Sequence, residues 1–176
     1  MQLGKLKFVD ISTDTQSVPP VVLSSTEENH LLNVFVSEID PTFADTTAFC
    51  EAYDIGMDVS ANCVIVEAKR AEKTWYAACV VLATSKADIN GIVRKHLGAR
   101  KISFAPMDKA VSMTGMEYGG ITPIGLPIDW PVIVDSRVNS TEKVIIGSGL
   151  RKSKLLIPGK LLASLPNALV LDIAKK

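Results

Sequence analysis

Two apolar segments joined by a short charged stretch constrain the fold of this chain most strongly. Residues 63–67 and 75–83 have the composition of β-strands, and residues 69–73 between them are mostly charged. This arrangement predicts an antiparallel hairpin. The second segment is apolar throughout, which is typical of a central strand buried on both faces. We therefore expect this strand to lie in the middle of a sheet.

The other segments follow no strict alternation of strand and helix. Strand-like patterns occur at 34–39, 101–104, 132–134, 143–146 and 169–171, and helical patterns at 20–29, 45–53, 88–97, 106–114 and 158–165. Asp45 stands where an N-cap of the second helix is expected. The pattern favours an α+β fold, with a mixed, mostly antiparallel, barrel-like sheet and flanking helices. Without a linker or an internal repeat, residues 1–176 are predicted to form a single domain.

The bulk composition excludes several classes of protein. The chain has 176 residues, 47% of them hydrophobic, and no apolar run approaches the roughly 20 residues of a membrane span. Neither a secretory leader nor a membrane segment is recognisable, so we expect a cytoplasmic protein. The three cysteines (Cys50, Cys63 and Cys79) and two histidines (His30 and His96) lack the spacing of a zinc site. We predict neither a metal nor a cofactor, and a cysteine–histidine nucleophile pair stays open as an alternative.

Charge is balanced overall but clustered locally. The formal net charge is zero, which argues against indiscriminate binding to nucleic-acid backbone. Two basic clusters stand out: Arg94, Lys95, Arg100 and Lys101 form the first, and Arg151, Lys152, Lys154 and Lys160 form the second. Solvated surface is the expected role of the first cluster.

Residues 115–125 contain two adjacent glycines, a Thr-Pro pair and a further glycine. Glycine permits positive φ and close approach of a ligand, whereas proline restricts its own φ and the residue before it. The stretch predicts a rigid exposed loop whose N–H groups can hold a developing oxyanion; a tight surface turn is the alternative. Dinucleotide, Walker A and nucleophile-elbow patterns are absent, which argues against a nucleotide-binding enzyme or a conventional triad hydrolase.

The glycine stretch resembles the TG-x-x-x-GGISPxG element of the YbaK/EbsC family. These free-standing aminoacyl-tRNA deacylases are related to the editing domain inserted in bacterial prolyl-tRNA synthetases. Further matches follow in order: residues 98–101 resemble the family's LGAkK turn, 131–135 its PTVID strand, and 144–151 its IYVSGGKRG loop. The resemblance covers about residues 60–174, and residues 1–60 are a divergent N-terminal part of the same domain.

The resemblance implies a YbaK-like editing domain that deacylates mischarged tRNA in trans, with a small amino acid on a tRNA-Pro type of tRNA. Such editing is needed because a synthetic site separates small side chains by only about 1–3 kcal/mol. The family holds the aminoacyl carbonyl on the backbone of a GxxxP loop, which maps to Gly119 and Pro123 here. Water then attacks with help from the neighbouring ribose hydroxyl. The implied partners are the 3′ end of aminoacyl-tRNA and an aminoacyl-tRNA synthetase.

Two positions depart from the family pattern. Asn62 stands where a lysine usually begins the strand, and Lys154 stands in the later loop where an aspartate is common. Our hypothesis is that both face one pocket, so that Lys154 supplies the missing cation. Asn62 would then hydrogen-bond the ribose or the substrate amine.

The expected site follows from these matches. Its catalytic residues are Gly119, Gly120, Lys154 and Asn62, and its substrate-binding residues are Thr122, Pro123, Gly147, Ser148, Gly149 and Tyr118. Two other functions stay open. One is a weak or inactive relative that binds aminoacyl-tRNA or a synthetase without hydrolysis, and the other is a small-molecule esterase or amidase.

Overall fold

The computed structural model describes all residues, 1–176. The strands are β1 (Gln2–Leu3), β2 (Leu6–Lys7), β3 (Val9–Asp10), β4 (Phe35–Glu38), β5 (Ala61–Arg70), β6 (Lys73–Leu82), β7 (Lys101–Phe104), β8 (Val132–Asp135), β9 (Lys143–Gly147), β10 (Ser153–Pro158) and β11 (Ala168–Leu171). The helices are α1 (Pro20–Glu28), α2 (Thr46–Tyr53), the π-helix η5 (Ile89–Val93), α3 (Arg94–His96), α4 (Met107–Thr114) and α5 (Ser136–Ser140). Short 3-10 turns cover Ile11–Thr13, Thr15–Ser17, Pro41–Phe43, Met57–Val59 and Gly159–Ser164.

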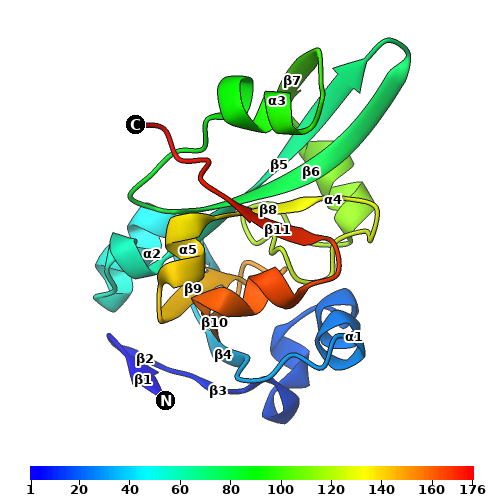
Figure 1. Cartoon of the computed structure of the whole chain (residues 1–176). Coiled ribbons are helices and arrows are strands. Elements are labelled where there is room, and N and C mark those ends of the chain that lie inside the picture. Colours follow the sequence, from blue (N-terminus) through cyan, green and yellow to red (C-terminus); the bar gives the residue numbers. More distant parts are fainter.

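Two larger sheets and one small hairpin make up the β-structure (Figure 1). One sheet has the strand order β11-β8-β6-β5-β7 and the other β3-β4-β10-β9, while β1 pairs with β2 alone. Only the β6–β8 and β8–β11 pairs are parallel. The predicted α+β fold with a mixed, mostly antiparallel sheet is therefore confirmed.

The predicted hairpin is present and longer than the sequence suggested. β5 and β6 pair over their full length, from Ala61 opposite Leu82 to Arg70 opposite Lys73. Only two residues form its turn, so part of the charged stretch belongs to the strands. The hairpin projects beyond the rest of the molecule in Figure 1.

β6 is buried on both faces, as its composition predicts. Because successive strand side chains point to opposite faces, Val80 enters the main core and Cys79 enters a second core on the outer side. The outer core is covered by η5 and by the C-terminal segment through Val93 and Ile173. The main core lies between the two sheets.

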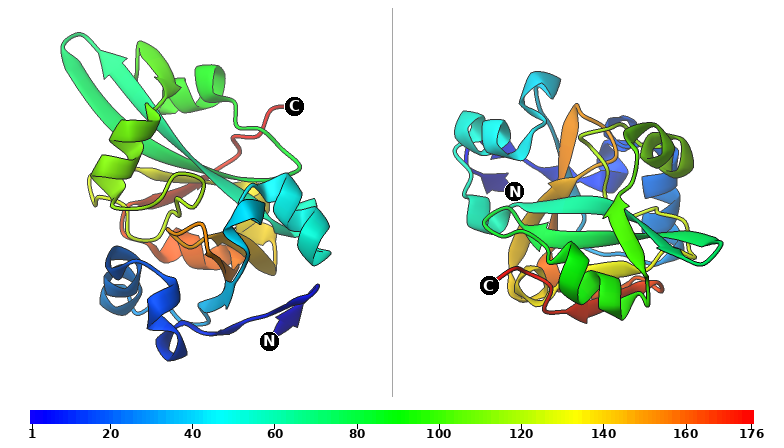
Figure 2. Two further views of the ribbon diagram at one scale, coloured as in Figure 1. Left: turned by 180° about the vertical axis from the view of Figure 1, so that it is seen from behind. Right: turned by 90° about the horizontal axis from the view of Figure 1, so that it is seen from above.

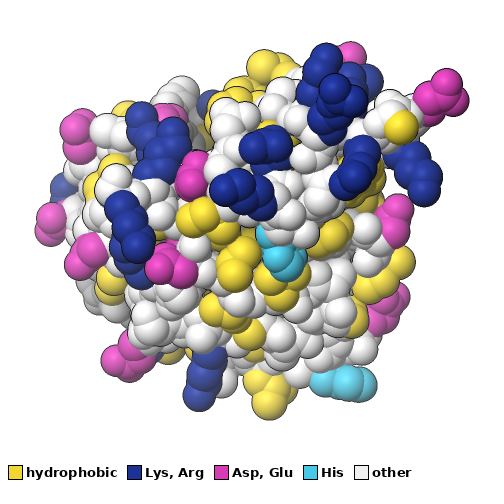
Figure 3. All heavy atoms as spheres, turned by 45° about the horizontal axis from the view of Figure 1, so that its top comes forward, with side chains coloured by type: hydrophobic (Ala, Val, Ile, Leu, Met, Phe, Trp, Pro, Cys, Tyr) yellow, Lys and Arg dark blue, Asp and Glu magenta, His cyan; other side chains and the backbone are white.

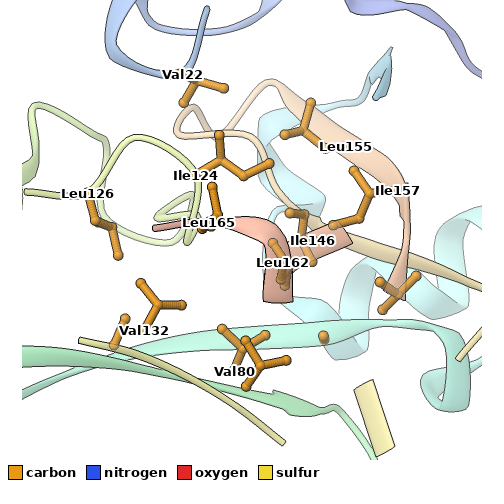
Figure 4. Close-up of a cluster of buried hydrophobic side chains, with 14 of the residues drawn as sticks. Val22, Val80, Ile124, Leu126, Val132, Ile146, Leu155, Ile157, Leu162 and Leu165 are labelled. Carbon is orange, nitrogen blue, oxygen red and sulfur yellow. The ribbon is translucent and has the colours of Figure 1, made fainter. Parts of the chain in front are cut away.

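Figure 4 shows side chains from both sheets meeting in the main core. They are Val80 and Val132 from the five-stranded sheet, Ile146, Leu155 and Ile157 from the four-stranded sheet, and Val22, Ile124, Leu126, Leu162 and Leu165 from the segments that close its ends. The sheets also touch at one margin, where Ser60 bridges to Ile145. The start of β5 is thereby held beside β9.

Two loops contain clustered glycines, the first at residues 119–125 and the second at residues 147–149. The segment after the second glycine loop differs from the prediction. Residues 153–158 form strand β10, which lies between β4 and β9 at the centre of its sheet. The sequence did not predict this strand because Lys154 lies near its start, and a central strand seldom contains a charged residue. The predicted helix over 158–165 is a 3-10 helix, Gly159–Ser164.

The predicted helix over 88–97 is also irregular. It begins as the π-helix η5, where the Asp88 carboxylate accepts hydrogen bonds from the N–H groups of Gly91 and Ile92, and continues into α3. His96, at the end of α3, is exposed. No helix of the chain combines the length and apolar character that crossing a membrane requires.

The main core provides a stability prediction. The Leu155 side chain is fully buried in the middle of that core, so Leu155→Ala should lower the free energy of unfolding by about 2–5 kcal/mol through lost burial and a residual cavity. Urea denaturation measures the loss. Val170→Ala, at a residue 39% exposed on β11, should cost less than about 1 kcal/mol. Equal losses at the two positions would contradict this assignment of the core.

Candidate functional site

A cavity of about 440 Å³ opens beside the start of β5. Its walls come from five segments: residues 44–46 at the start of α2, the first half of β5, the β7–α4 connection, the first glycine loop, and the end of β9 with the segment that follows it. α2 and α4 lie on opposite sides of this region in both views of Figure 2. Segments far apart in the sequence therefore meet at one site.

The two glycine loops are in direct backbone contact. Gly149 donates its N–H to the carbonyl of Gly120 at 2.7 Å. A Cβ on Gly120 would lie 2.7 Å from the Leu150 carbonyl carbon, and one on Gly147 would lie 2.6 Å from the Gly120 oxygen. Gly119 has φ +83° and packs against the Arg151 guanidinium. A side chain at Gly120 or Gly147 would force the loops apart, because it would meet backbone atoms of the other loop.

Backbone donors are available on the wall that the first loop forms. Gly120 donates its N–H to the Glu117 carbonyl at 3.0 Å, within the turn. The N–H groups of Gly119 and Ile121 donate no hydrogen bond within the protein, and both residues line the cavity. These two N–H groups therefore have no partner within the protein, and the residues that carry them border the cavity.

Lys154 reaches the cavity from β10, where it pairs with Ser37 and Gly147. The residue is only 7% exposed, and its Nζ donates to the Ala44 carbonyl at 3.0 Å. Nζ also lies 5.2 Å from the centroid of the Phe49 ring. No carboxylate lies within 4.0 Å of it, since both ion pairs of the molecule involve Glu67.

The surroundings of Lys154 shift its ionisation. Burial lowers the pKa of the ammonium group to about 8, against the opposing effects of Cys50 and Asp45 and with a further contribution from Arg151. A buried ammonium without a carboxylate partner favours its neutral form, because desolvation penalises the charge. Lys154 therefore changes charge close to neutral pH.

Asn62 lies on the same cavity from the start of β5. Its Oδ1 accepts a 2.6 Å hydrogen bond from the Thr46 hydroxyl, which fixes the orientation of the amide. Its Nδ2 has no acceptor within the protein. The structure thus brings Asn62 and Lys154 to one cavity, with donors on both side chains still available.

The other expected site residues divide into two groups. Tyr118, Gly119 and Gly147 line the cavity with Asn62 and Lys154. Those that do not line it are Gly120, Thr122, Pro123, Ser148 and Gly149.

The residues behind the wall have supporting contacts. The Ser148 hydroxyl is buried and bonds to the Ser153 hydroxyl at 2.6 Å and to the Leu150 carbonyl at 3.0 Å. Thr122 is fully buried, and Pro123 borders a separate groove against α1. These residues hold the loops in position, and their side chains do not reach the cavity.

Two charged residues that sequence reasoning did not include in the site also line the cavity. Asp45 occupies the N-cap position of α2, but its side chain makes no capping bond, contrary to the prediction. Its exposed carboxylate is available to a ligand. The Arg151 guanidinium donates to the carbonyls of Tyr118 at 3.3 Å and Pro41 at 3.1 Å. Nothing local in the sequence distinguished Asp45 from an ordinary cap.

The cysteine–histidine alternative has no geometric basis. Cys63 lines the cavity, but burial raises the pKa of its thiol, with a smaller contribution from Cys79. The thiol is therefore protonated near neutral pH and a weak nucleophile. His30 and His96 are exposed and lie outside the cavity. No cluster of three or more His, Cys, Asp or Glu side chains is arranged to hold a metal ion.

Residues 40–165 match the family model of the aminoacyl-tRNA editing domain. The chain belongs to this family, which confirms the resemblance found in the sequence. Residues 1–39 precede the match.

Solved structures share the fold at low sequence identity. A candidate trans-editing enzyme for prolyl tRNA synthetase is 16% identical with a TM-score of 0.76, and the match covers 91% of this chain and all of that one. The hypothetical protein APE2540 is 20% identical with a TM-score of 0.76, over 88% of this chain and 99% of that one. A candidate signal transduction protein from Marinobacter aquaeolei VT8 is 20% identical with a TM-score of 0.59, over 90% of this chain but 31% of its own length. At these identities the likeness shows the fold alone.

The buried ammonium of Lys154 leads to a prediction about stability and pH. Its native pKa of about 8 lies below the ordinary value of 10.5. The unfolded chain therefore binds more protons between these pH values, and the cost of burying this residue falls as pH rises through that window. Below it, the shift corresponds to a cost of about 3 kcal/mol. Lys154→Met should remove this cost, less the lost hydrogen bond to Ala44.

Urea unfolding across the window between about pH 7 and pH 10 measures the effect. The stability of Lys154→Met relative to the wild type should be greatest near pH 7 and decline towards pH 10. Lys160→Met, at an exposed lysine, is the matched control and should differ from the wild type by a constant amount. A pH-independent difference at Lys154 would show that its ammonium is not desolvated.

Proposed function

We propose that this protein is a trans-editing hydrolase that removes a small amino acid from mischarged tRNA of the tRNA-Pro type. One observation carries the proposal. Gly119 and Ile121, whose backbone N–H groups have no partner within the protein, line the same cavity as the buried lysine Lys154. Membership of the aminoacyl-tRNA editing family supports the substrate class.

The proposed chemistry is hydrolysis of an ester by water. The aminoacyl carbonyl oxygen accepts hydrogen bonds from the Gly119 and Ile121 N–H groups, which also stabilise the negative charge that develops during attack. Water adds to the carbonyl carbon with assistance from the neighbouring ribose hydroxyl. The bond to the ribose oxygen then breaks, that oxygen takes up a proton, and a free amino acid and tRNA result. The Lys154 ammonium stabilises the same developing charge.

Other parts of the cavity suit the rest of the substrate. The Asp45 carboxylate can pair with the α-ammonium of the amino acid, and the Asn62 amide can donate to a ribose hydroxyl. Ala61, Ala105 and Ala110 line the cavity with short side chains, which is consistent with a small amino acid. We place the activity in the cytoplasm, with the 3′ end of aminoacyl-tRNA and an aminoacyl-tRNA synthetase as partners.

The direct test is deacylation of tRNA-Pro charged with alanine, cysteine or serine. Lys154→Ala should reduce turnover by about 100-fold, the typical effect of removing one stabilising donor. Because the lysine acts as a cation, wild-type activity should fall as pH rises through about 8, and the residual activity of Lys154→Ala should lack this decline. Lys160→Ala serves as the matched control and should retain wild-type turnover.

Other outcomes of the same assay identify the alternatives. Unchanged turnover in Lys154→Ala would overturn the role of this lysine. Binding of charged tRNA without hydrolysis by the wild type would indicate an inactive relative. Equal rates on amino-acid esters that lack tRNA would indicate a small-molecule esterase.

The Asp45 carboxylate gives a separate prediction. Asp45→Asn should lower kcat/KM by about 10-fold, because a charge-assisted bond to the α-ammonium is weakened. A substrate with an acetylated α-amine has no ammonium, so wild type and variant should cleave it at equal rates. Equal activity on the free-amine substrate would contradict this role, and measurement of both substrates in parallel distinguishes recognition from misfolding.

A further inference from the structure

One end of the molecule, formed by α3, β7 and the hairpin tip, is markedly basic (Figure 3). Residues 67–73 and 88–101 contain seven lysines and arginines against three acidic residues, in a chain with nineteen of each overall. We name as the basic face the five residues Lys69, Arg70, Arg94, Arg100 and Lys101. The first basic cluster of the sequence is thus extended by cations from the hairpin.

Most of these cations have no acidic partner. Lys69 pairs with Glu67 at 3.0 Å, whereas the other four have no carboxylate within 4.0 Å. The Arg70 guanidinium donates to the Gly98 carbonyl at 3.1 Å, and Arg94 Nε donates to the Asn90 carbonyl at 2.8 Å. These bonds hold two guanidinium groups in place and leave their remaining N–H groups available.

Four of the five cations border a common groove. A depression of about 460 Å³ has eight lining residues: the cations Lys69, Arg94, Arg100 and Lys101, and Glu67, Asn90, Ile102 and Ser103. The carboxylate of Glu67 is buried and paired with Lys69 and Lys109, which leaves three unpaired cations on the walls. A groove with lysine and arginine on its walls fits a chain of phosphates, since these residues neutralise phosphate oxygens without reading sequence.

The groove and the candidate active site share strand β7. This strand is the edge of the five-stranded sheet. Lys101 to Ser103 line the groove, and the next residue, Phe104, lines the cavity. At about 3.3 Å per residue, Lys101 and Phe104 are separated by about 10 Å along the strand. A ligand can therefore extend from one to the other.

Phe104 is unusually exposed for its type. It is 68% exposed at the rim of the cavity, so core packing does not account for an aromatic residue here. An exposed ring beside a basic groove is suited to stacking on an unpaired nucleic-acid base.

We propose that the basic face binds the phosphate backbone of the tRNA acceptor helix, and that Phe104 stacks on an unpaired base as the 3′ end enters the cavity. This inference rests on the proposed function, because it places the same substrate on the surface around the site. The groove and its continuity with the cavity are what distinguish this surface from the solvated cluster that the sequence suggested.

Binding of uncharged tRNA, followed by fluorescence anisotropy at several salt concentrations, tests the basic face. R100Q/K101Q should weaken binding by at least about 10-fold at low salt and reduce the slope of log affinity against log salt by about two. K143Q/K160Q removes two exposed lysines beyond the basic face and should change neither quantity. If R100Q/K101Q binds tRNA with the affinity and salt slope of the wild type, the proposal is overturned. That result would also be expected if this face bound an acidic protein instead of tRNA.

The role of Phe104 is tested with two RNAs. Phe104→Ala should weaken binding of intact tRNA by about 10-fold, and Phe104→Trp should restore it, because stacking needs only an aromatic face. A tRNA trimmed of its unpaired 3′ end should bind wild type and Phe104→Ala equally. An equal loss for intact and trimmed tRNA would exclude stacking on that end.

A minimal substrate separates this inference from the proposed function. On an aminoacyl ester of adenosine, R100Q/K101Q should match the wild type, whereas on aminoacyl-tRNA its KM should rise and kcat should stay the same. If the wild type deacylates aminoacyl-tRNA and R100Q/K101Q has an unchanged KM, the proposed docking surface is wrong but the proposed function is not. If tRNA binding is salt-sensitive and depends on these residues but no deacylation occurs, the proposed hydrolysis is wrong and the docking surface is supported.

Discussion

The candidate site depends on direct contact between the backbones of two glycine loops. Gly120 lies against Leu150, and its carbonyl accepts the Gly149 N–H, so the two loops are held in one arrangement. Helix α1 supports them from behind, where Gly125 lies close to the Val21 backbone. Since the Gly120 amide is used within the turn, the donors that remain on the cavity wall are those of Gly119 and Ile121. The contact between the loops therefore fixes the position of the wall, and the turn within the first loop determines which of its N–H groups lack a partner.

A buried lysine is the second unusual feature, and it opposes stability. Lys154 lies on the central strand of its sheet, with a hydrogen bond to Ala44 and an aromatic ring as its main compensation. Groups whose pKa is shifted by desolvation cluster at functional sites. Such sites are also where a residue type most often disagrees with its structural environment, as a lysine does on a buried strand. The position of Lys154 beside Asn62 and the Gly119 loop is consistent with this, because a buried cation is useful where negative charge develops.

Much of the fold could be predicted from local patterns. The β5–β6 hairpin, the burial of β6 on both faces, and the end of α4 at Gly115 follow from periodicity, apolar composition and the left-handed conformation of glycine. The misses have two causes. β10 is a strand because β4 and β9 pair with it on both sides, and that pairing overrides the charge at Lys154. The irregular start at η5 instead follows a local contact, in which the Asp88 carboxylate accepts hydrogen bonds from the N–H groups of Gly91 and Ile92.

The sequence by itself determined the class of fold, the family and the two glycine loops, because these depend on short motifs whose backbone requirements are local. Only the tertiary structure decided which loop residues face the cavity, that Asp45 is available instead of capping α2, and that the basic face continues into the site along β7. Each of these depends on contacts between distant segments, such as Lys154 with Ala44 or Arg151 with Pro41. Packing free energy summed over the whole chain sets such contacts, and no single segment contains that information.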